Sequence, residues 1–279
     1  MKKNIFILFI SLLFILPSNV LGQEINEETI NLDANSLERI EKLKIPTEYL
    51  EELDPIILEN LLENPDHDEF ESTTTYIWSE EKSELIPIAS ITQDGVESYN
   101  ERSISPMGTI PSKDFALTID IYTDASKGGR KPKTVYTRYE WYKAPFYLYK
   151  DPFGVSWSDK WRPVDKTAYK VDYYKSPSAS SWSIFEQSSA FAYSGQYGIG
   201  WDANLYTWAL TGHTKLKGYG KVQIETKATT NPKGSDQVHV NYAHKKGTGS
   251  LGLSFGKISV NITGNASNDT RGNYKTFSY

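Results

Sequence analysis

The sequence predicts a mainly β fold, an antiparallel β-sandwich or barrel-like domain preceded by a short acidic α-helical N-terminal segment. Charge is sorted along the chain: residues 24–101 hold 22 Asp/Glu and 4 Lys/Arg, whereas residues 102–279 hold 13 Asp/Glu and 24 Lys/Arg. Beyond residue 105, short alternating runs are separated by Gly, Pro, Asn and Asp, as in all-β domains. The chain has no cysteine, so its core must be stable without disulfides.

The first 22 residues have the composition of a secretory signal peptide. Lys2 and Lys3 give a positive start, and the apolar stretch from Ile5 to Leu16 has 12 residues. A membrane-spanning helix needs roughly 20 residues, although an N-terminal anchor is the alternative. We expect cleavage between Gly22 and Gln23, and a secreted, extracellular chain without a further transmembrane segment. The composition is typical of a bacterial exoprotein.

Residues 23–105 are expected to form the acidic, partly helical N-terminal segment. Asn35 or Ser36 can cap a helix over residues 37–43, and a second apolar stripe follows over residues 47–64. Strand-like pieces follow at residues 74–78 and 85–91. Because the segment is acidic and the remainder basic, we interpret it as a pro-region or an arm that docks on the following domain.

Residues 106–279 are expected to form a basic, aromatic-rich all-β domain. The segment from Ser105 to Pro111 holds two prolines and a glycine, which disfavour regular structure and mark the boundary. Beyond it, period-two alternation and turn residues predict strands at residues 115–122, 133–142, 146–149, 167–175, 182–193, 204–217, 221–228, 237–245, 251–255, 259–263 and 274–279.

Two short motifs resemble each other within this domain. Phe153-Gly-Val-Ser-Trp157 and Tyr197-Gly-Ile-Gly-Trp201 lie 44 residues apart, and Leu253-Ser-Phe255-Gly is a weaker third copy. The glycines predict a bulge or a close approach of a neighbouring strand. A duplicated hairpin and coincidence both remain open.

The aromatic residues of the domain suggest a binding surface. Tryptophan and tyrosine rings can stack on sugars, while nearby carboxylates hold hydroxyl groups. The alternative is that the rings fill the core of the sandwich. The candidate ligand-binding residues are Trp141, Tyr149, Asp151, Trp157, Asp159, Trp161, Trp201 and Asp202.

A basic loop suggests contact with an anionic surface, such as a cell-wall polymer or a membrane. Its candidate residues are Lys127, Arg130, Lys131 and Lys133, and a solvated hairpin loop is the alternative. No helical DNA-reading pattern or aromatic-basic RNA motif accompanies them, so nucleic acid is not an expected partner.

The sequence offers no catalytic motif. The four histidines include no His-Glu-x-x-His pair, and His239 and His244 are five apart on a predicted strand. We therefore predict no catalytic residue, cofactor or metal site. Carboxylates brought together by the sheet are the one catalytic alternative, for a glycosidase with an inhibitory N-terminal segment; they are Asp120, Glu140, Asp172, Glu186 and Glu225.

The leading functional hypothesis is a non-catalytic binding or surface-associated protein whose β-domain contacts a carbohydrate, a cell-wall polymer or a protein partner. The first alternative is a membrane-active, pore-forming protein, because residues 247–263 alternate apolar and polar residues as membrane hairpins do. Lys257 interrupts that stripe and argues against it. The second alternative is the secreted hydrolase.

Overall fold

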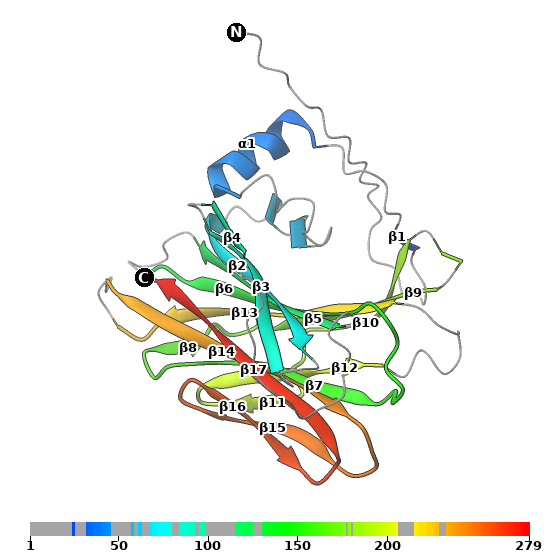
Figure 1. The fold of residues 1–279 in the computed structure, drawn as a ribbon. Coiled ribbons are helices and arrows are strands. Elements are labelled where there is room, and N and C mark those ends of the chain that lie inside the picture. The colour runs from blue at the N-terminus through cyan, green and yellow to red at the C-terminus, as the bar shows by residue number, and fades with distance from the viewer. Residues whose placement is uncertain are drawn as a thin grey trace.

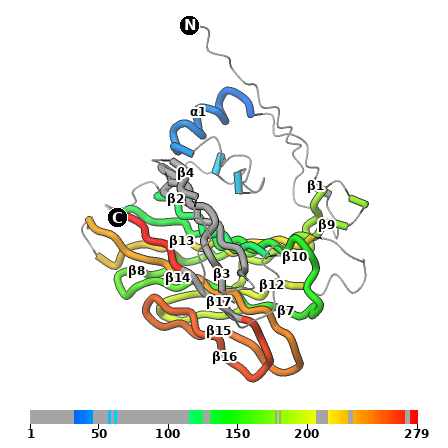
Figure 2. Tube along the Cα trace, in the orientation of Figure 1, coloured from blue at the N-terminus to red at the C-terminus, as the bar shows by residue number. Residues whose placement is uncertain are grey.

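The fold was analysed in a computed structural model. It describes residues 24–25, 32–45, 57–58, 61–62, 67–79, 84–92, 95–98, 115–124, 130–176, 178–179, 181–205, 215–228 and 233–279 (Figure 1). Figure 2 follows the same chain as a tube, with residues 67–98 among those left in grey. The expected fold class is confirmed, because the described chain is mainly β, with antiparallel sheets packed as a sandwich and a short N-terminal helix.

The larger sheet has ten strands, of which nine follow the order β1-β10-β9-β13-β6-β5-β2-β3-β4, while β8 pairs with β13 (Figure 1). The strands are β1 (Glu24–Ile25), β2 (His67–Ser79), β3 (Glu84–Thr92), β4 (Gly95–Ser98), β5 (Phe115–Asp124), β6 (Lys133–Trp141), β8 (Trp161–Pro163), β9 (Tyr169–Lys175), β10 (Trp182–Ser188) and β13 (Lys215–Thr226).

The smaller sheet has five strands in the order β11-β12-β7-β14-β17, and β15 and β16 form a separate two-stranded sheet. The strands are β7 (Lys150–Trp157), β11 (Tyr193–Gly195), β12 (Gly198–Asn204), β14 (Ser235–Lys245), β15 (Leu251–Gly256), β16 (Ser259–Gly264) and β17 (Asn268–Ser278). Residues 146–149, expected as a strand, instead lie in the irregular connection between β6 and β7.

The main core lies between the two sheets. In β5, the alternate residues Phe115, Leu117, Ile119 and Ile121 face it, as their period-two spacing predicted. Every residue of β5 is buried, however, so its other face is covered as well. The sandwich therefore has a further layer outside the large sheet.

That outer layer is built by the N-terminal segment. Helix α1 (Ala34–Leu43) presents Ile40 and Leu43 to one apolar cluster, shared with the buried Leu61 and with aromatic side chains of the large sheet. The aromatic members are Tyr122, Tyr136, Tyr173, Trp182 and Tyr219. Figure 1 shows α1 on one side of the sandwich and the β15–β16 hairpin on the other.

The cap of α1 differs from the predicted one. The Asp33 carboxylate accepts a hydrogen bond from the Ser36 main-chain N–H at 2.7 Å and so forms the N-cap. Asn35 and Ser36, the expected caps, are inside the helix because an aspartate two residues earlier satisfies a free N–H group of the first turn. Lys44 ends the helix in the left-handed conformation, at φ 56°.

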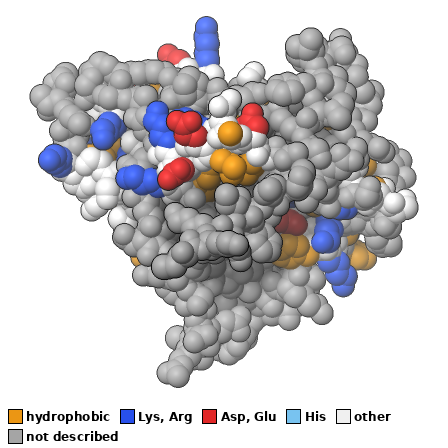
Figure 3. Space-filling model, turned by 90° about the horizontal axis from the view of Figure 1, so that it is seen from above, with side chains coloured by type: hydrophobic (Ala, Val, Ile, Leu, Met, Phe, Trp, Pro, Cys, Tyr) orange, Lys and Arg blue, Asp and Glu red, His pale blue; other side chains and the backbone are white. Residues whose placement is uncertain are grey.

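The acidity expected of the N-terminal segment is not confirmed for its described helix. Helix α1 holds Glu38 and Glu41 beside Arg39 and Lys42. Figure 3, a view from above, likewise shows acidic and basic side chains intermixed where side chains are described. Most of residues 47–64, which carry much of the acid, lie outside the described residues.

The expected boundary near residue 105 does not separate two sheets. Strand β2 pairs with β5 over most of its length, and β1 pairs with β10. Residues on both sides of the boundary therefore share the large sheet. Removal of residues 23–105 by proteolysis stays a prediction.

A buried lysine joins the two sheets. The Lys170 ammonium donates to Asp172 Oδ2 of the large sheet at 2.7 Å and to the Asp202 main-chain oxygen of the small sheet at 2.7 Å. It also lies 3.2 Å from Glu186 Oε1. All three protons of the ammonium thus have acceptors, as a buried cation requires.

Packing of α1 predicts a clear contrast between two leucines. Leu43→Ala should lower the free energy of unfolding by about 2–5 kcal/mol, because it removes fully buried methyl groups. Leu37→Ala on the same helix should change it by less than about 0.5 kcal/mol, because Leu37 is 52% exposed. Urea denaturation measures both, and equal losses would contradict docking of α1.

The inter-sheet lysine predicts a second stability effect. Lys170→Met should destabilise the fold by about 3–5 kcal/mol, because the Asp172 carboxylate would be left buried without its cation. Burial already raises the pKa of Asp172, against the opposing charge of Lys170. The ionised form is thus the costly one, and the loss should grow as the pH rises above the raised pKa that Asp172 has in the folded parent.

The matched control is Lys215→Met, at an exposed position of β13. Denaturation curves at several pH values give both free energies. A Lys170→Met variant as stable as the control would show that the buried ion pair is dispensable.

Candidate functional site

The four candidate tryptophans lie in the core of the sandwich. Trp141, Trp157, Trp161 and Trp201 are each at most 1% exposed and belong to the main core cluster. Trp201 packs across the sandwich against Gly220 of β13. These rings therefore fill the core of the sandwich, which was the alternative interpretation of the sequence. Their faces are not available for stacking on a ligand.

Asp151 is also buried, at the centre of a closed polar network. Its carboxylate accepts hydrogen bonds from Tyr242 Oη at 2.7 Å, from the His244 ring nitrogen Nδ1 at 2.8 Å and from the Lys245 main-chain N–H at 2.9 Å. Trp141 Nε1 donates to Tyr242 Oη at 2.9 Å, so the network links both sheets. Burial, followed by the Asp151 charge, raises the pKa of Tyr242, which keeps the hydroxyl protonated as a donor.

Four of the five carboxylates considered for glycoside hydrolysis, all except Glu140, form the ion pairs described here. Asp120 binds Arg138 at 2.7 Å, and Glu225 binds both Arg130 and Arg162. Asp172 and Glu186 share the buried Lys170, and Asn204 donates to both carboxylates through its main-chain N–H and its side-chain amide.

The remaining candidates are dispersed. Tyr149 lies in the connection between β6 and β7, and Asp202 accepts a hydrogen bond from Tyr193 Oη at 2.6 Å. Of the basic loop, Lys127 lies outside the described residues, while Lys131 is exposed. Arg130 is paired with Glu225, as described above, and Lys133 is buried with its ammonium donating to Thr123 Oγ1 at 2.7 Å. The described basic residues thus form no common exposed patch.

The feature that distinguishes this molecule is a long hairpin folded back on itself. Strand β14 pairs with β17 in continuous register, from the Ser235–Ser278 pair to the Lys245–Asn268 pair. After a short interruption, β15 pairs with β16 in a register only two residues away, from Leu251–Gly264 onward. The two pairs of strands are therefore successive parts of one hairpin, running from residue 235 to residue 278.

Two main-chain hydrogen bonds show that the outer part of the hairpin reverses direction. The main-chain N–H of Lys245, at the end of β14, donates to Asp151 at the start of β7. The main-chain N–H of Ile258, at the tip of the hairpin, donates to the Trp157 oxygen at the end of β7, at 3.2 Å. The outer part of the hairpin thus runs back along the whole length of β7 (Figure 1).

Glycines make the reversal. Gly249 and Gly264 adopt φ values of 109° and 105°, which residues with a side chain rarely reach. The Ser250 main-chain oxygen accepts hydrogen bonds from the N–H groups of Asn265 and Ala266, both at 3.0 Å. Residues 246–250 and 265–267 together form the bend.

The folded-back hairpin is amphipathic. Leu253 and Val260 are buried, and their alternate neighbours Ser254, Asn261 and Thr263 are exposed. The apolar side therefore faces the small sheet.

A glycine-lined face of the small sheet receives this apolar side. A Cβ atom built on Gly154 or Gly200 would lie 2.8 or 2.6 Å from Leu253 Cδ1, and one on Gly198 would collide with the Phe255 ring. These glycines belong to the two similar sequence motifs, and Gly154 and Gly200 are direct partners in the β7–β12 pairing. The expected close approach is thus found.

Few polar contacts hold the hairpin to the sandwich. Asn241 Nδ2 donates to the Val260 main-chain oxygen at 2.9 Å, and Tyr193 Oη lies 3.3 Å from the Leu251 oxygen. Within the described residues, β15 and β16 pair only with each other. Apolar contact on the glycines is therefore the main attraction.

An ion pair latches the tip. Lys257, in the turn between β15 and β16, donates to Asp159 Oδ2 at 2.5 Å. The hydrogen bond from Lys257 and then its charge lower the pKa of Asp159, and the same contact raises the pKa of Lys257. We refer to this pair as the tip latch.

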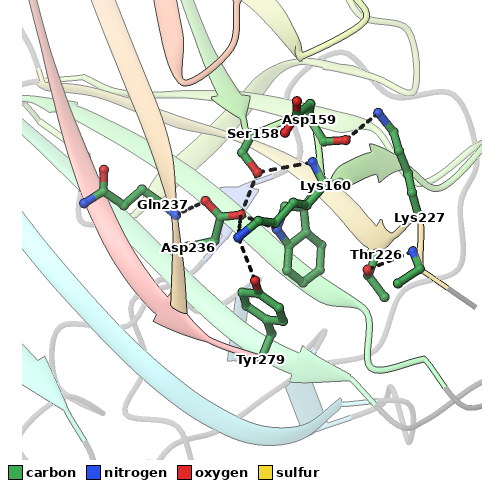
Figure 4. Close-up of polar contacts among 10 residues, drawn as sticks. Ser158, Asp159, Lys160, Thr226, Lys227, Asp236, Gln237 and Tyr279 are labelled. Carbon is green, nitrogen blue, oxygen red and sulfur yellow. Dashed lines mark hydrogen bonds and ion pairs between the residues drawn. The ribbon is translucent and has the colours of Figure 1, made fainter. Parts of the chain in front are cut away.

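The turn that carries Asp159 is itself fixed. Figure 4 shows Lys227 donating to the Asp159 main-chain oxygen, at 2.9 Å, and Ser158 Oγ donating to Asp236, at 2.6 Å. Lys160 donates to Tyr279 Oη at 2.8 Å on the same end of the sandwich. The tip latch therefore closes on an ordered acceptor.

Comparisons with known proteins give no family. No family model and no curated protein matches the chain. Among solved structures, a protein described as "Pore forming protein" is similar at 9% identity and a TM-score of 0.30, covering 60% of this chain and 87% of its own. The collagen binding domain of Erysipelothrix rhusiopathiae surface protein RspB is similar at 10% identity and a TM-score of 0.24, covering 74% and 84%.

The described residues show neither a metal-binding cluster nor a membrane-spanning helix. They contain no group of three or more His, Asp or Glu side chains arranged to hold a metal ion. No helix among them is long and apolar enough to cross a membrane.

The tip latch predicts a local and pH-dependent effect. Asp159→Asn should speed amide hydrogen exchange in residues 251–264, because the substitution removes the negative partner of Lys257. The lowered pKa of Asp159 means that the latch stabilises the closed tip above the ordinary value of 3.8 and is lost as the pH falls through its lower, folded-state value. The difference between variant and parent should therefore vanish in acid.

Mass spectrometry of peptides from this region measures the exchange. Asp165→Asn, in the exposed turn after β8, is the matched control and should leave the rates unchanged. Equal rates for Asp159→Asn and the parent at neutral pH would show that the ion pair does not hold the tip.

Proposed function

We propose that this protein is a secreted, membrane-active protein that inserts its folded-back hairpin into a lipid bilayer and forms pores. The observation that supports this proposal is the hairpin itself: an amphipathic extension of β14 and β17, stored against a glycine-lined face with few polar contacts to it. A stored hairpin of this kind can be released without breaking the ladder of the small sheet.

The extension has the length of a membrane-crossing hairpin. Residues 246–256 and 259–269 each supply 11 residues, and a tilted transmembrane strand needs about 9–11. In the first leg, Leu251, Leu253 and Phe255 alternate with polar residues or glycine. The β15–β16 register places Val260 and Ile262 opposite Phe255 and Leu253, so both legs present one apolar side.

Lys257 no longer argues against insertion. It lies in the turn between the two legs, where its charge would emerge in water on the far side of the bilayer. The residues of the lipid-facing stripe, Leu251, Leu253, Phe255, Val260 and Ile262, therefore include no charge.

Insertion requires assembly. A single hairpin in lipid would leave the backbone groups of both edges without hydrogen bonds, at several kcal/mol each. Pairing with hairpins of further copies satisfies those edges, so the membrane form of this protein is an oligomer.

Surface binding without insertion is the second candidate. Lys160, Lys227, Tyr197 and Tyr279 gather on the end of the sandwich that carries the tip latch, with the Lys160 ammonium 5.4 Å from the Tyr279 ring centre. Ordered ammonium and phenol groups suit an anionic glycan or cell-wall polymer, or a protein partner. Retention on such a polymer at low salt without release of vesicle contents would favour this candidate.

The pore proposal predicts that locking the hairpin abolishes activity. In Gly195→Cys/Phe255→Cys, the two Cβ atoms would lie about 3.3 Å apart, close to the range of a disulfide. The chain has no other cysteine. We expect the oxidised variant to release no dye from phosphatidylcholine/phosphatidylglycerol vesicles, and reduction to restore release.

A second disulfide provides the matched control. Gly247→Cys/Ser267→Cys joins the two legs at the bend, with Cβ atoms about 3.7 Å apart, and leaves the hairpin unattached to the sandwich. This variant should release dye when oxidised. Release by oxidised Gly195→Cys/Phe255→Cys, or no release by the parent protein, would overturn the proposal.

A further inference from the structure

The connection between β6 and β7 presents exposed aromatic rings. Phe146 is 89% exposed, Tyr142 is 40% exposed and Tyr147 is 38% exposed. Residues 142–149, which we call the aromatic loop, carry these rings. Residues 146–149 were expected to form a strand, but the segment is irregular and directly follows Pro145, which lacks a main-chain N–H group.

The aromatic loop is anchored from below. Ala144 and Leu148 pack against the main core, and the Tyr149 main-chain oxygen accepts a hydrogen bond from Leu205 at 3.2 Å. The Phe146 and Tyr147 ring centres are 5.0 Å apart in an edge contact. Phe146 is therefore exposed on a loop whose neighbouring side chains are fixed by packing.

Basic residues surround the rings. Lys143 within the loop and Lys150 directly after it are exposed, and the Lys245 ammonium lies 5.1 Å from the Tyr149 ring centre. Asp151, which follows Lys150, is buried and hydrogen-bonded, whereas the partly exposed Glu186 lies within reach of the Lys150 charge. The exposed surface of the aromatic loop itself therefore carries aromatic rings and lysines, with one acid beside Lys150.

The aromatic loop lies beside the base of the stored hairpin. Lys245, which contacts Tyr149, is the last residue of β14, and the bend begins at Lys246. The tip latch is at the opposite end of β7. A hairpin released from the glycine-lined face and extended along β14 would thus emerge next to the aromatic loop.

We propose that the aromatic loop docks this protein on a lipid bilayer with anionic headgroups. Phe146 enters the acyl boundary, Tyr142 and Tyr147 lie at headgroup level, and Lys143 and Lys150 contact lipid phosphates. Amphipathic rings and snorkelling lysines favour this interface. The inference rests on the proposed function and identifies its first step, the contact that brings the hairpin to the membrane.

Vesicle flotation with full-length protein tests the docking surface. Phe146→Ser should lower partitioning onto phosphatidylcholine/phosphatidylglycerol vesicles about tenfold or more, because a phenyl ring is no longer buried in lipid. Phe191→Ser, which removes an exposed ring of the same type from the β10–β11 connection, should bind as the parent does. Denaturation curves should coincide for all three proteins.

A charge variant tests the anionic preference. Lys143→Glu/Lys150→Glu should lose the extra binding that phosphatidylglycerol gives over phosphatidylcholine alone, and added salt should weaken the parent in the same way. Parent-like vesicle binding by Phe146→Ser would overturn the inference. So would a Phe146→Ser variant that loses retention on an immobilised polysaccharide or protein but keeps its vesicle binding.

The experiments can distinguish a failure of the docking inference from a failure of the pore proposal. The oxidised Gly195→Cys/Phe255→Cys protein should float with vesicles although it releases no dye. If the parent binds vesicles through Phe146 but releases nothing, the pore proposal falls and the docking surface stands. If release persists in Phe146→Ser with unchanged binding, the docking surface falls and the pore proposal stands.

Discussion

The close approach of Leu253 and Phe255 to a sheet face without side chains is the contact on which the stored hairpin depends. Glycine inside a strand costs about 0.5–1 kcal/mol relative to alanine, so several glycines on one face weaken the sheet unless something packs there. Here Gly154, Gly198 and Gly200 leave room that the hairpin fills. Any side chain at those positions would separate the two layers.

The body that stores the hairpin is held together independently of it. The β7–β12 and β7–β14 ladders are continuous beneath the hairpin. Across the sandwich, Trp141 reaches Tyr242 and Lys170 reaches the Asp202 main chain. Because these contacts involve neither β15 nor β16, the sandwich would keep its core and its inter-sheet hydrogen bonds if the hairpin were released. The N-terminal segment stabilises the opposite face through Leu43 and its cluster.

The sequence predicted the elements better than their surroundings. Alternation correctly placed β5, because period two is a local property of one strand. It did not show that both faces of β5 are covered, since the second cover comes from α1 and lies far away in sequence. For the same reason, the tryptophans that were candidates for a binding surface lie in the core. The composition shows that a ring is present, but not whether another layer of the protein covers it. Pairing of β2 with β5 is equally non-local, and it puts strands from both sides of residue 105 in one sheet.

The positions of the tip latch, the bend and the aromatic loop determine how a bilayer could shift the hairpin from its folded-back to its extended form. The proposed docking through Phe146 would use a surface that is the same in both forms, so docking alone cannot favour extension. Only groups that differ between the two states can do so. The apolar side of the hairpin is one such group, because Leu253 and Phe255 contact glycines when stored and would contact lipid when extended. The tip latch opposes release at the far end of β7, whereas the bend lies beside the aromatic loop. Under the proposed function, the bilayer would therefore act on the equilibrium through the hairpin, and the aromatic loop would only set where the hairpin meets the lipid.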